Sequence, residues 1–425
     1  MENEIMLHNS LEAWLSYIEK LHPSEIELGL TRISKVGKAL DLIHFDAMVI
    51  TVGGTNGKGT TCAFLEEILM QAGYKVGVYS SPHILRYSER LRINKQELSA
   101  EDHCQAFELI EKTRKEISLS YFEFVTLGCL ALLKKENCDF ILLEVGLGGR
   151  LDATNMVESD ISVITTIAID HVDWLGDNRE KIGYEKAGIF RRNKPVICGE
   201  YEPPQSLVNH AKDIGADIYY ANKDFHFTDK VSSWDWCGKS TIKDIPQTLM
   251  PRQNASTALA VIEALALDID KSVLCRAIQQ AKLAGRLQKC VTGAVCDLYI
   301  DVAHNPQSAQ YLASQIEQLR QAKDNCRVFA IIGMLRDKDV IGTFDVINGQ
   351  IDDCNLISLA CARGASCQSL LSSYQQSKDS HQQVTCFENI ELAYKSVANR
   401  VTSSDIIVIF GSFFTVSDFL TFSQG

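Results

Sequence analysis

A glycine-rich octapeptide constrains this chain more than any other segment. It is Gly53-Gly54-Thr55-Asn56-Gly57-Lys58-Gly59-Thr60, and it lies between an apolar stretch (residues 47–52) and an amphipathic run that continues to about residue 71. A glycine-rich turn lets successive backbone N–H groups face one anion, and a following helix adds the positive end of its dipole. The pattern therefore predicts a strand, a phosphate-binding loop and a helix, with Lys58 adding a full charge and a nucleoside triphosphate as the expected ligand.

The sequence of this loop departs from the common P-loop motif. A common P-loop has four residues between its first glycine and the Gly-Lys pair, and then Ser or Thr directly after the lysine. Here three residues separate Gly53 from Gly57, Gly59 occupies the hydroxyl position, and Thr60 follows one position later. The alternative is a glycine-rich turn with a surface lysine, which the flanking strand and helix patterns disfavour. The loop predicts phosphate binding and leaves the reaction open.

Length and composition narrow the class of protein. A chain of 425 residues with 46% hydrophobic content should form two or three domains. Lys and Arg total 42 against 54 Asp and Glu, which disfavours a nucleic-acid or anionic-membrane surface. The fourteen cysteines are scattered without a Cys-x-x-Cys pair, so we expect free thiols. The first ten residues do not resemble a secretion signal and no stretch is long enough to span a membrane, so we expect a cytoplasmic protein.

Strand and helix patterns alternate along the chain. The first series of strands is expected at residues 47–52, 75–80, 139–145, 161–168 and 195–198, with an apolar helix near residues 124–134. This pattern predicts an α/β fold with a mostly parallel, doubly wound sheet. A polar stretch at residues 225–248 predicts a small antiparallel excursion, and residues 254–267 predict a helix. Strands at residues 297–302, 327–333, 355–361 and 405–411 predict a smaller Rossmann-like α/β domain, which gives domains at 1–285 and 286–425.

Two side chains follow predicted strands where a nucleotide-bound metal would lie. P-loop phosphoryl chemistry uses Mg²⁺, which prefers oxygen ligands. Glu144 ends an apolar strand and leads into a second glycine-rich turn at residues 145–152, although it could also be a solvated strand terminus. His171 follows another strand, and alone it is a weak signal.

Other charged residues have competing interpretations. Lys186 precedes Gly188 at a helix end, where a lysine simply complements the helix dipole. The arginines at positions 86, 90 and 92 could bind an anionic substrate or form a solvated basic face. Asp301 follows a strand and suits either a ribose contact or a helix cap.

Together these motifs resemble the Mur ligase superfamily, and within it the dihydrofolate synthase/folylpolyglutamate synthase branch. The resemblance covers nearly the whole chain. Its carriers are Gly54-Thr55-Asn56-Gly57-Lys58-Gly59-Thr60, Ser80-Ser81-Pro82-His83, Tyr121-Phe122-Glu123, Leu143-Glu144-Val145-Gly146-Leu147-Gly148-Gly149-Arg150-Leu151-Asp152-Ala153-Thr154-Asn155, Asp170-His171, Glu185-Lys186-Ala187-Gly188-Ile189-Phe190 and Asp301-Val302-Ala303-His304-Asn305-Pro306.

The resemblance implies an ATP-dependent acid–amino-acid ligase. Such an enzyme would phosphorylate a pterin-linked carboxylate, and the amine of L-glutamate would attack the acyl phosphate. The implied substrates are 7,8-dihydropteroate, which would give dihydrofolate, and reduced folates, which would be polyglutamylated. The alternatives are a monofunctional folylpolyglutamate synthase, another Mur-type amino-acid ligase such as a peptidoglycan ligase, or, in a different class, a P-loop switch without catalysis.

The resemblance also assigns roles residue by residue. Catalysis would involve Lys58, His171 and Lys186, with Ser81 and Glu144 holding one Mg²⁺ and His171 and a carboxylated Lys186 serving a second; K⁺ is a further candidate cofactor. Residues implied to bind ATP are Thr55, Asn56, Gly57, Lys58, Gly59, Thr60, Asn254, Arg286, Asp301 and His304. Residues implied to bind the pterin substrate are Glu27, Leu28, Gly29, Leu30, Ser120, Tyr121, Phe122, Glu123, Leu151, Asp152 and Ala153.

Three positions depart from the family pattern. Ala284 replaces the usual proline before the glycine-arginine pair, Leu287 replaces a common phenylalanine, and Arg252 stands where proline is common. None removes an implied catalytic group. We expect a monomer with small-molecule substrates and no nucleic-acid or membrane partner.

Overall fold

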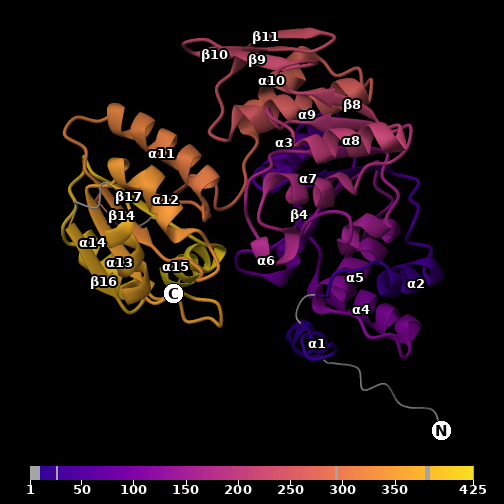
Figure 1. The fold of residues 1–425 in the computed structure, drawn as a ribbon, viewed down its shortest axis with the longest axis horizontal. Helices are drawn as coiled ribbons and strands as arrows, with labels where there is room; N and C mark the ends of the chain where they lie inside the picture. Colours follow the sequence, from indigo (N-terminus) through magenta and orange to yellow (C-terminus); the bar gives the residue numbers. More distant parts are fainter. Residues whose placement is uncertain (1–9, 25–26, 292–294, 379–382, 425) are drawn as a thin grey trace. The chain divides into compact units, whose positions relative to one another are not determined.

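The computed structural model describes residues 10–24, 27–291, 295–378 and 383–424 (Figure 1). The chain divides into two compact units, Met1–Ala281 and Lys282–Gly425. Each unit has its own sheet and its own hydrophobic core.

The first unit contains an eight-stranded sheet in the order β4-β3-β2-β5-β1-β6-β7-β8. Its strands are β1 (Met48–Gly53), β2 (Val76–Tyr79), β3 (Leu91–Ile93), β4 (Gln96–Glu97), β5 (Phe140–Glu144), β6 (Ile161–Ile164), β7 (Pro195–Cys198) and β8 (Asp217–Tyr220). The six strands from β2 to β8 in this order run parallel, whereas β3 pairs antiparallel with both β2 and β4. The predicted mostly parallel sheet is confirmed.

Helices cover both faces of this sheet because its central strands are apolar on both sides. One core lies between the sheet and the helices α1 (Leu11–Ile18), α2 (Thr31–Ala39), α4 (Ala100–Arg114) and α5 (Tyr121–Glu136). A second core includes α7 (Arg179–Ala187) and α8 (Gln205–Ile214). Helix α3 (Lys58–Gln71) is buried nearly all round, since it also packs against α9 (Arg252–Ala264) and α10 (Lys271–Gln280).

The polar stretch after β8 forms a three-stranded antiparallel sheet, as its composition predicted (Figure 1). Its strands are β9 (His226–Asp229), β10 (Ser233–Cys237) and β11 (Thr241–Pro246). It packs on α9 and α10, with Trp234 and Trp236 buried beneath it.

The second unit contains a six-stranded sheet in the order β12-β13-β17-β14-β15-β16. Its strands are β12 (Gln288–Cys290), β13 (Asp297–Ile300), β14 (Val328–Ile332), β15 (Asp353–Ile357), β16 (Gln383–Phe387) and β17 (Ile406–Phe410). Its helices are α11 (Pro306–Gln321), α12 (Val340–Ile347), α13 (Cys367–Gln376), α14 (Ile390–Ala398) and α15 (Phe413–Gln424). All strand pairs except β12–β13 are parallel, which confirms a second α/β fold.

Two further expectations concern the whole chain. All fourteen cysteines carry free thiols, as predicted. Within the described ranges, no helix combines the length and the apolar character needed to cross a bilayer.

Candidate active site

The predicted phosphate-binding loop connects β1 to α3. Gly54 and Gly57 have φ angles of 144° and 88°, values that residues with a Cβ rarely adopt. A Cβ at Gly54 would collide with Thr165, and a Cβ at Gly57 would lie 2.7 Å from the amide atoms of Asn254. Both glycines are thus required by conformation and by close approach. The same contact brings Asn254, a predicted nucleotide-binding residue, against the loop.

The loop is fastened to the segment that follows β6. The Thr55 amide donates to the Thr166 carbonyl (2.7 Å), and the Thr165 hydroxyl donates to the Asn56 carbonyl (2.6 Å). The Thr55 hydroxyl donates to the carbonyl of Ala168 (3.1 Å). The strand predicted to reach residue 168 therefore ends at Ile164, because the next residues bond to the loop instead of extending the sheet. Thr165 and Thr166 were not predicted as site residues, although they directly follow the end of β6.

Two lysine ammonium groups converge on one carbonyl of the loop. Lys58 Nζ donates to the carbonyls of Gly54 and Thr55, each at 3.1 Å. Lys186 Nζ donates to the same Gly54 carbonyl at 2.9 Å, although α7, which carries it, is far away in the sequence. The structure thus brings Lys186 into the site, and it does more there than complement a helix end.

The surroundings of Lys186 disfavour its charge. Its side chain is only 4% exposed, and no carboxylate among the described residues forms an ion pair with it. Burial lowers the pKa of Lys186 to about 7, and the neighbouring Lys58 adds to the effect, whereas Asp170 and Asp152 oppose it. A substantial share of this amine is therefore unprotonated, and nucleophilic, near neutral pH.

The predicted metal donors lie at one edge of the sheet. Ser81 follows β2, Glu144 ends β5, and His171 lies beyond β6. Strands β2, β5, β1 and β6 are consecutive and parallel, so their carboxyl ends meet beside the loop. Val52 pairs with Glu144 in the strand register. The topology therefore gathers these donors at the point where strand connections diverge to opposite sides of β1.

Hydroxyl and carboxylate oxygens suit Mg²⁺, and the imidazole of His171 would add a nitrogen donor. Among the described residues there is no cluster of three or more His, Cys, Asp and Glu side chains that could hold a metal ion. The predicted set contains only Glu144 and His171 of these types, so the two findings are compatible. Glu144 is 7% exposed, and a carboxylate in that position suits a bound cation. The Ser81 hydroxyl and the Glu144 carboxylate are oxygen donors of the kind that such an ion prefers.

The glycine-rich turn after Glu144 packs on the end of α7. The Arg150 amide donates to the Glu185 carbonyl (2.7 Å), and its guanidinium donates to the Glu185 carboxylate (2.8 and 3.1 Å). A Cβ at Gly149 would come within about 3.0 Å of the carbonyls of Glu185 and Lys186. The turn therefore holds the helix end from which Lys186 projects. Arg150 was not predicted as a site residue.

The three segments predicted to bind the pterin substrate meet in the first unit. The Gly29 amide donates to the Leu151 carbonyl (3.3 Å), which joins residues 27–30 to residues 151–153. Arg32 pairs with Glu27 and donates to Glu123 (3.2 and 3.3 Å), which joins the first segment to residues 120–123. Arg32 lies outside the motifs and was not predicted.

Two members of these segments have identifiable local roles. Phe122 lies against Gly146, where a Cβ would come within 2.5 Å of its ring, and it stacks on Tyr79 at 6.3 Å. Asp152 is buried and accepts hydrogen bonds from the amides of Leu147 (2.8 Å) and Thr154 (3.0 Å). Burial raises the pKa of Asp152, which these hydrogen bonds oppose. Asp152 thus stabilises the turn whatever else it binds.

The arginines at positions 86, 90 and 92 were expected either to bind an anionic substrate or to form a solvated basic face, and each instead contacts a protein group. Arg86 pairs with Glu97 (2.8 Å) at the surface, and buried Arg90 donates to His83 (2.8 Å). Arg92 pairs with buried Glu66 (2.8 Å). The three side chains bind protein groups, and they do not form one basic face.

The second unit brings together its three predicted nucleotide-binding residues. Asp301 is buried and accepts from the amides of Leu287 (2.8 Å) and Ala303 (2.7 Å). Burial raises the pKa of Asp301, and nearby Arg286 opposes that rise. The Arg286 guanidinium and the His304 ring both lie near Phe413, with centroid distances of 5.5 and 6.4 Å. Phe413 was not predicted.

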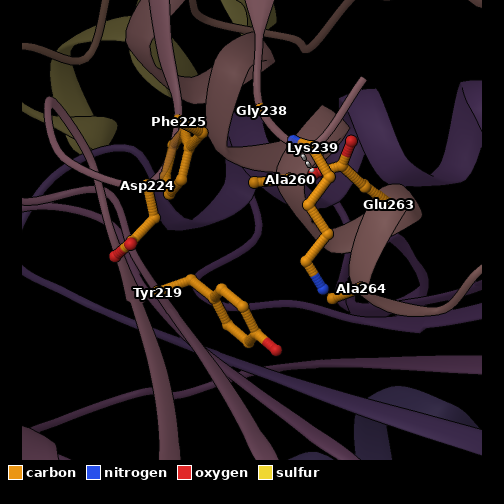
Figure 2. A pocket seen from close by; sticks show the side chains of 8 residues that line it. All are labelled: Tyr219, Asp224, Phe225, Gly238, Lys239, Ala260, Glu263 and Ala264. Carbon is orange, nitrogen blue, oxygen red and sulfur yellow. Dashed lines mark hydrogen bonds between the residues drawn. The ribbon is translucent and has the colours of Figure 1, made fainter.

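A separate pocket of about 160 Å³ lies between β8 and the second half of α9 (Figure 2). Lys239 Nζ lies 5.0 Å from the ring centroid of Tyr219, and Glu263 accepts from the amide of Lys239 (2.8 Å). The pocket contains none of the predicted site residues. Of these, Asn254 is the one on α9, and it lies in the first turn of that helix.

Fold and site together define a P-loop α/β protein in which two lysines and a strand-end carboxylate surround a nucleotide loop. The sequence profile of the Mur ligase middle domain matches residues 52–265, and that of the Mur ligase, glutamate ligase domain, matches residues 285–413. The dihydrofolate synthase/folylpolyglutamate synthase of Escherichia coli K12 is 43% identical over 96% of this chain and 94% of its own length. That of Haemophilus influenzae is 41% identical over 96% of each chain.

Solved structures agree with these relatives. E. coli FolC in complex with DHPP and ADP has a TM-score of 0.91 at 41% identity, covering 98% of both chains. The bifunctional enzyme of Yersinia pestis, complexed with AMPPNP and a Mn ion, has a TM-score of 0.91 at 43% identity and the same coverage. A bifunctional enzyme with Mn, AMPPNP and L-glutamate bound has a TM-score of 0.89 at 42% identity, again over 98% of both chains. The chain belongs to the dihydrofolate synthase/folylpolyglutamate synthase branch of the Mur ligase family.

Proposed function

We propose that this protein is an ATP-dependent ligase that joins L-glutamate to 7,8-dihydropteroate, forming dihydrofolate, and to reduced folates, forming polyglutamates. The observation that carries the proposal is the convergence of Lys58 and Lys186 on the Gly54 carbonyl of a phosphate-binding loop. Relatives bound to ADP or AMPPNP, to Mn and to L-glutamate support it.

The chemistry requires an activated acyl group. A carboxylate is a poor acyl donor because oxide would have to leave. Transfer of the ATP γ-phosphoryl group to the carboxylate oxygen gives an acyl phosphate and ADP. The glutamate amine then attacks the acyl carbon, the C–N bond forms, phosphate leaves with the C–O bond electrons, and the nitrogen loses one proton. Lys58 and the loop amides would stabilise the transferring charge.

Ser81 and Glu144 would hold one Mg²⁺, and His171 with Lys186 would hold a second. A bound Mg²⁺ neutralises phosphate charge during transfer. Lys186 would first react with CO₂, which gives a carbamate and releases one proton. That reaction needs an uncharged amine, and it converts a buried cation into an oxygen ligand. K⁺ is a further candidate cofactor.

The remaining assignments are also proposals. Asn254 and residues 55–60 would bind ATP, with Arg286, Asp301 and His304 of the second unit contributing to the same nucleotide. Residues 27–30, 120–123 and 151–153 would bind the pterin, and Arg32 would hold the first two of these segments together. The predictions of a monomer, a cytoplasmic location and the absence of nucleic-acid or membrane partners stay predictions.

A substrate panel tests the function. Purified protein with ATP and Mg²⁺ is given dihydropteroate or tetrahydrofolate, each with and without L-glutamate, and the products are separated by mass. We expect glutamate-dependent products with both pterins. If a glutamate-dependent product forms with tetrahydrofolate but not with dihydropteroate, the protein is a monofunctional folylpolyglutamate synthase. Nucleotide binding without any amide product would support the P-loop switch and overturn the proposal.

A further inference from the structure

A buried ion pair joins the P-loop helix to the strand beside the predicted metal site. Glu66 of α3 has a side chain only 3% exposed, and both its oxygens accept from Arg92 Nε of β3, at 2.8 and 3.1 Å. Arg92 also donates from Nη1 to the Ser80 hydroxyl at 3.0 Å. One guanidinium therefore links a helix, a strand and the residue that precedes Ser81.

The pair lies on the side of α3 that carries the P-loop lysine. Lys58, Cys62 and Glu66 follow one another at intervals of four residues, so they share one face of the helix. Burial raises the pKa of the Cys62 thiol, and the charges near enough to act on it are Glu144, Arg92, Glu66 and Lys58. The ion pair and the strand-end carboxylate thus both act electrostatically on the same thiol.

Ser80 is held from two directions. Its amide donates to the Arg90 carbonyl (2.9 Å), and its hydroxyl accepts from Arg92. Strands β2 and β3 are in register here, with Val78 opposite Arg92 and Tyr79 opposite Leu91. The backbone that leads into Ser81 is therefore fixed by β3, and β3 is fixed to α3 by the ion pair.

We propose that Arg92 is a positioning residue that sets the Ser80–Ser81 turn against the P-loop helix, so that the Ser81 hydroxyl can bind the metal of the metal–nucleotide complex. This inference rests on the proposed function, which assigns Ser81 to the metal. A guanidinium suits the task because its rigid fork can bind a carboxylate through one nitrogen and a hydroxyl through another. Arg92 thereby acts through Ser81 and not on the substrate.

The neighbouring ion pair provides a matched control. Glu67 and Lys95 come from the same helix and the same β3–β4 hairpin, and they also form an ion pair. The contacts of this pair do not extend to Ser80. Removing it should affect the packing of the hairpin without affecting the turn.

The test compares Ser80→Ala, Arg92→Lys and Ser81→Ala with Glu67→Gln in the full chain. Mn²⁺ binding in the presence of ADP is measured by electron paramagnetic resonance, the Mg²⁺ requirement of turnover by titration, and folding by thermal unfolding without metal or nucleotide. Ser80→Ala leaves the Glu66–Arg92 pair intact, so it keeps the test valid if Arg92→Lys folds poorly.

We expect Ser80→Ala and Arg92→Lys to weaken Mn²⁺ binding about tenfold, to raise the Mg²⁺ requirement in parallel, and to unfold as Glu67→Gln does. If Ser81→Ala weakens Mn²⁺ binding but Ser80→Ala does not, the positioning role is wrong and the metal assignment stands. If Ser81→Ala has no effect either, the metal assignment itself fails, and the positioning role with it.

Discussion

The buried amine of Lys186 donates to the Gly54 carbonyl of the phosphate-binding loop. Replacing this residue should therefore impair catalysis while the protein still folds. In Lys186→Ala the site loses the group proposed to become a metal ligand, so we expect turnover to fall by about 100-fold or more. Small carboxylates such as acetate should restore part of it, because they can supply the missing oxygen. The control is Lys181→Ala, which removes an exposed lysine from the same helix. Wild-type-like turnover in Lys186→Ala, measured as glutamate-dependent ADP release, would exclude Lys186 as a metal ligand.

Gly57 shows how one residue serves both backbone and site. It has a φ of 88°, and Gly73 at the other end of α3 has a φ of 94°. Alanine at either position should cost about 1–2 kcal/mol of unfolding free energy through backbone strain, which urea unfolding can measure. Only at Gly57 would the new Cβ meet Asn254, whereas at Gly73 nothing lies within 4 Å. We therefore expect Gly57→Ala, and not Gly73→Ala, to lose nucleotide affinity; equal affinities would mean that the loop tolerates this Cβ.

At the scale of elements, long periodic segments were predictable and short irregular ones were not. The apolar runs of β1, β5, β14 and β17 and the helix α3 were predicted because their patterns repeat over several residues. The β3–β4 hairpin has few residues, several of them charged, and its stability comes from the tertiary contacts of Arg92 and Lys95. Sequence spacing cannot show such contacts.

The site follows the same rule. Strand-end positions identified Glu144 and His171 as candidates. The importance of Lys186 came from the family resemblance, because its contact with Gly54 depends on how α7 packs. Arg32 and Arg150 were missed for that reason, since each acts by joining segments that are distant in sequence.

Helix α4 contains a buried histidine that should make stability depend on pH. His103 is fully buried against Tyr87 and Phe107, and neither ring nitrogen has a hydrogen-bond partner. Burial lowers the pKa of His103 from 6.5 to about 4. Below pH 6.5 the unfolded chain binds a proton that the folded chain excludes, so stability is lost as the pH falls toward 4. Between pH 7 and pH 5 the loss should be about 2 kcal/mol.

Urea unfolding of His103→Phe at these two pH values measures that contribution. The ring shape is nearly kept while the titrating group is removed, so the difference between pH 7 and pH 5 should shrink by about 2 kcal/mol. His226→Gln, which changes an exposed histidine of β9, should leave the difference unchanged. An unaltered pH dependence in His103→Phe would show that other groups control acid unfolding.

At the scale of the whole molecule, the residues proposed to bind ATP are divided between the two units. The loop, its two lysines and the strand-end donors belong to Met1–Ala281, whereas Arg286, Asp301 and His304 belong to Lys282–Gly425. Within the second unit, the guanidinium of Arg286 lies near the carboxylate of Asp301 and over the aromatic ring of Phe413. A charged hydrogen bond to a phosphate contributes about 1.5–3 kcal/mol, so Arg286→Ala should weaken ATP binding by at least about tenfold.

A surface arginine of the second unit supplies the comparison. Arg320 at the end of α11 pairs with Asp352 at 2.8 Å, and removing a surface ion pair costs little stability. Calorimetric titration with ATP should give wild-type affinity for Arg320→Ala and reduced affinity for Arg286→Ala, with both variants folded by circular dichroism. Because the loop is intact in both, a selective loss would mean that the second unit contributes directly to nucleotide binding. Equal affinity in the two variants would confine ATP binding to the first unit and leave the second to serve glutamate or the pterin alone.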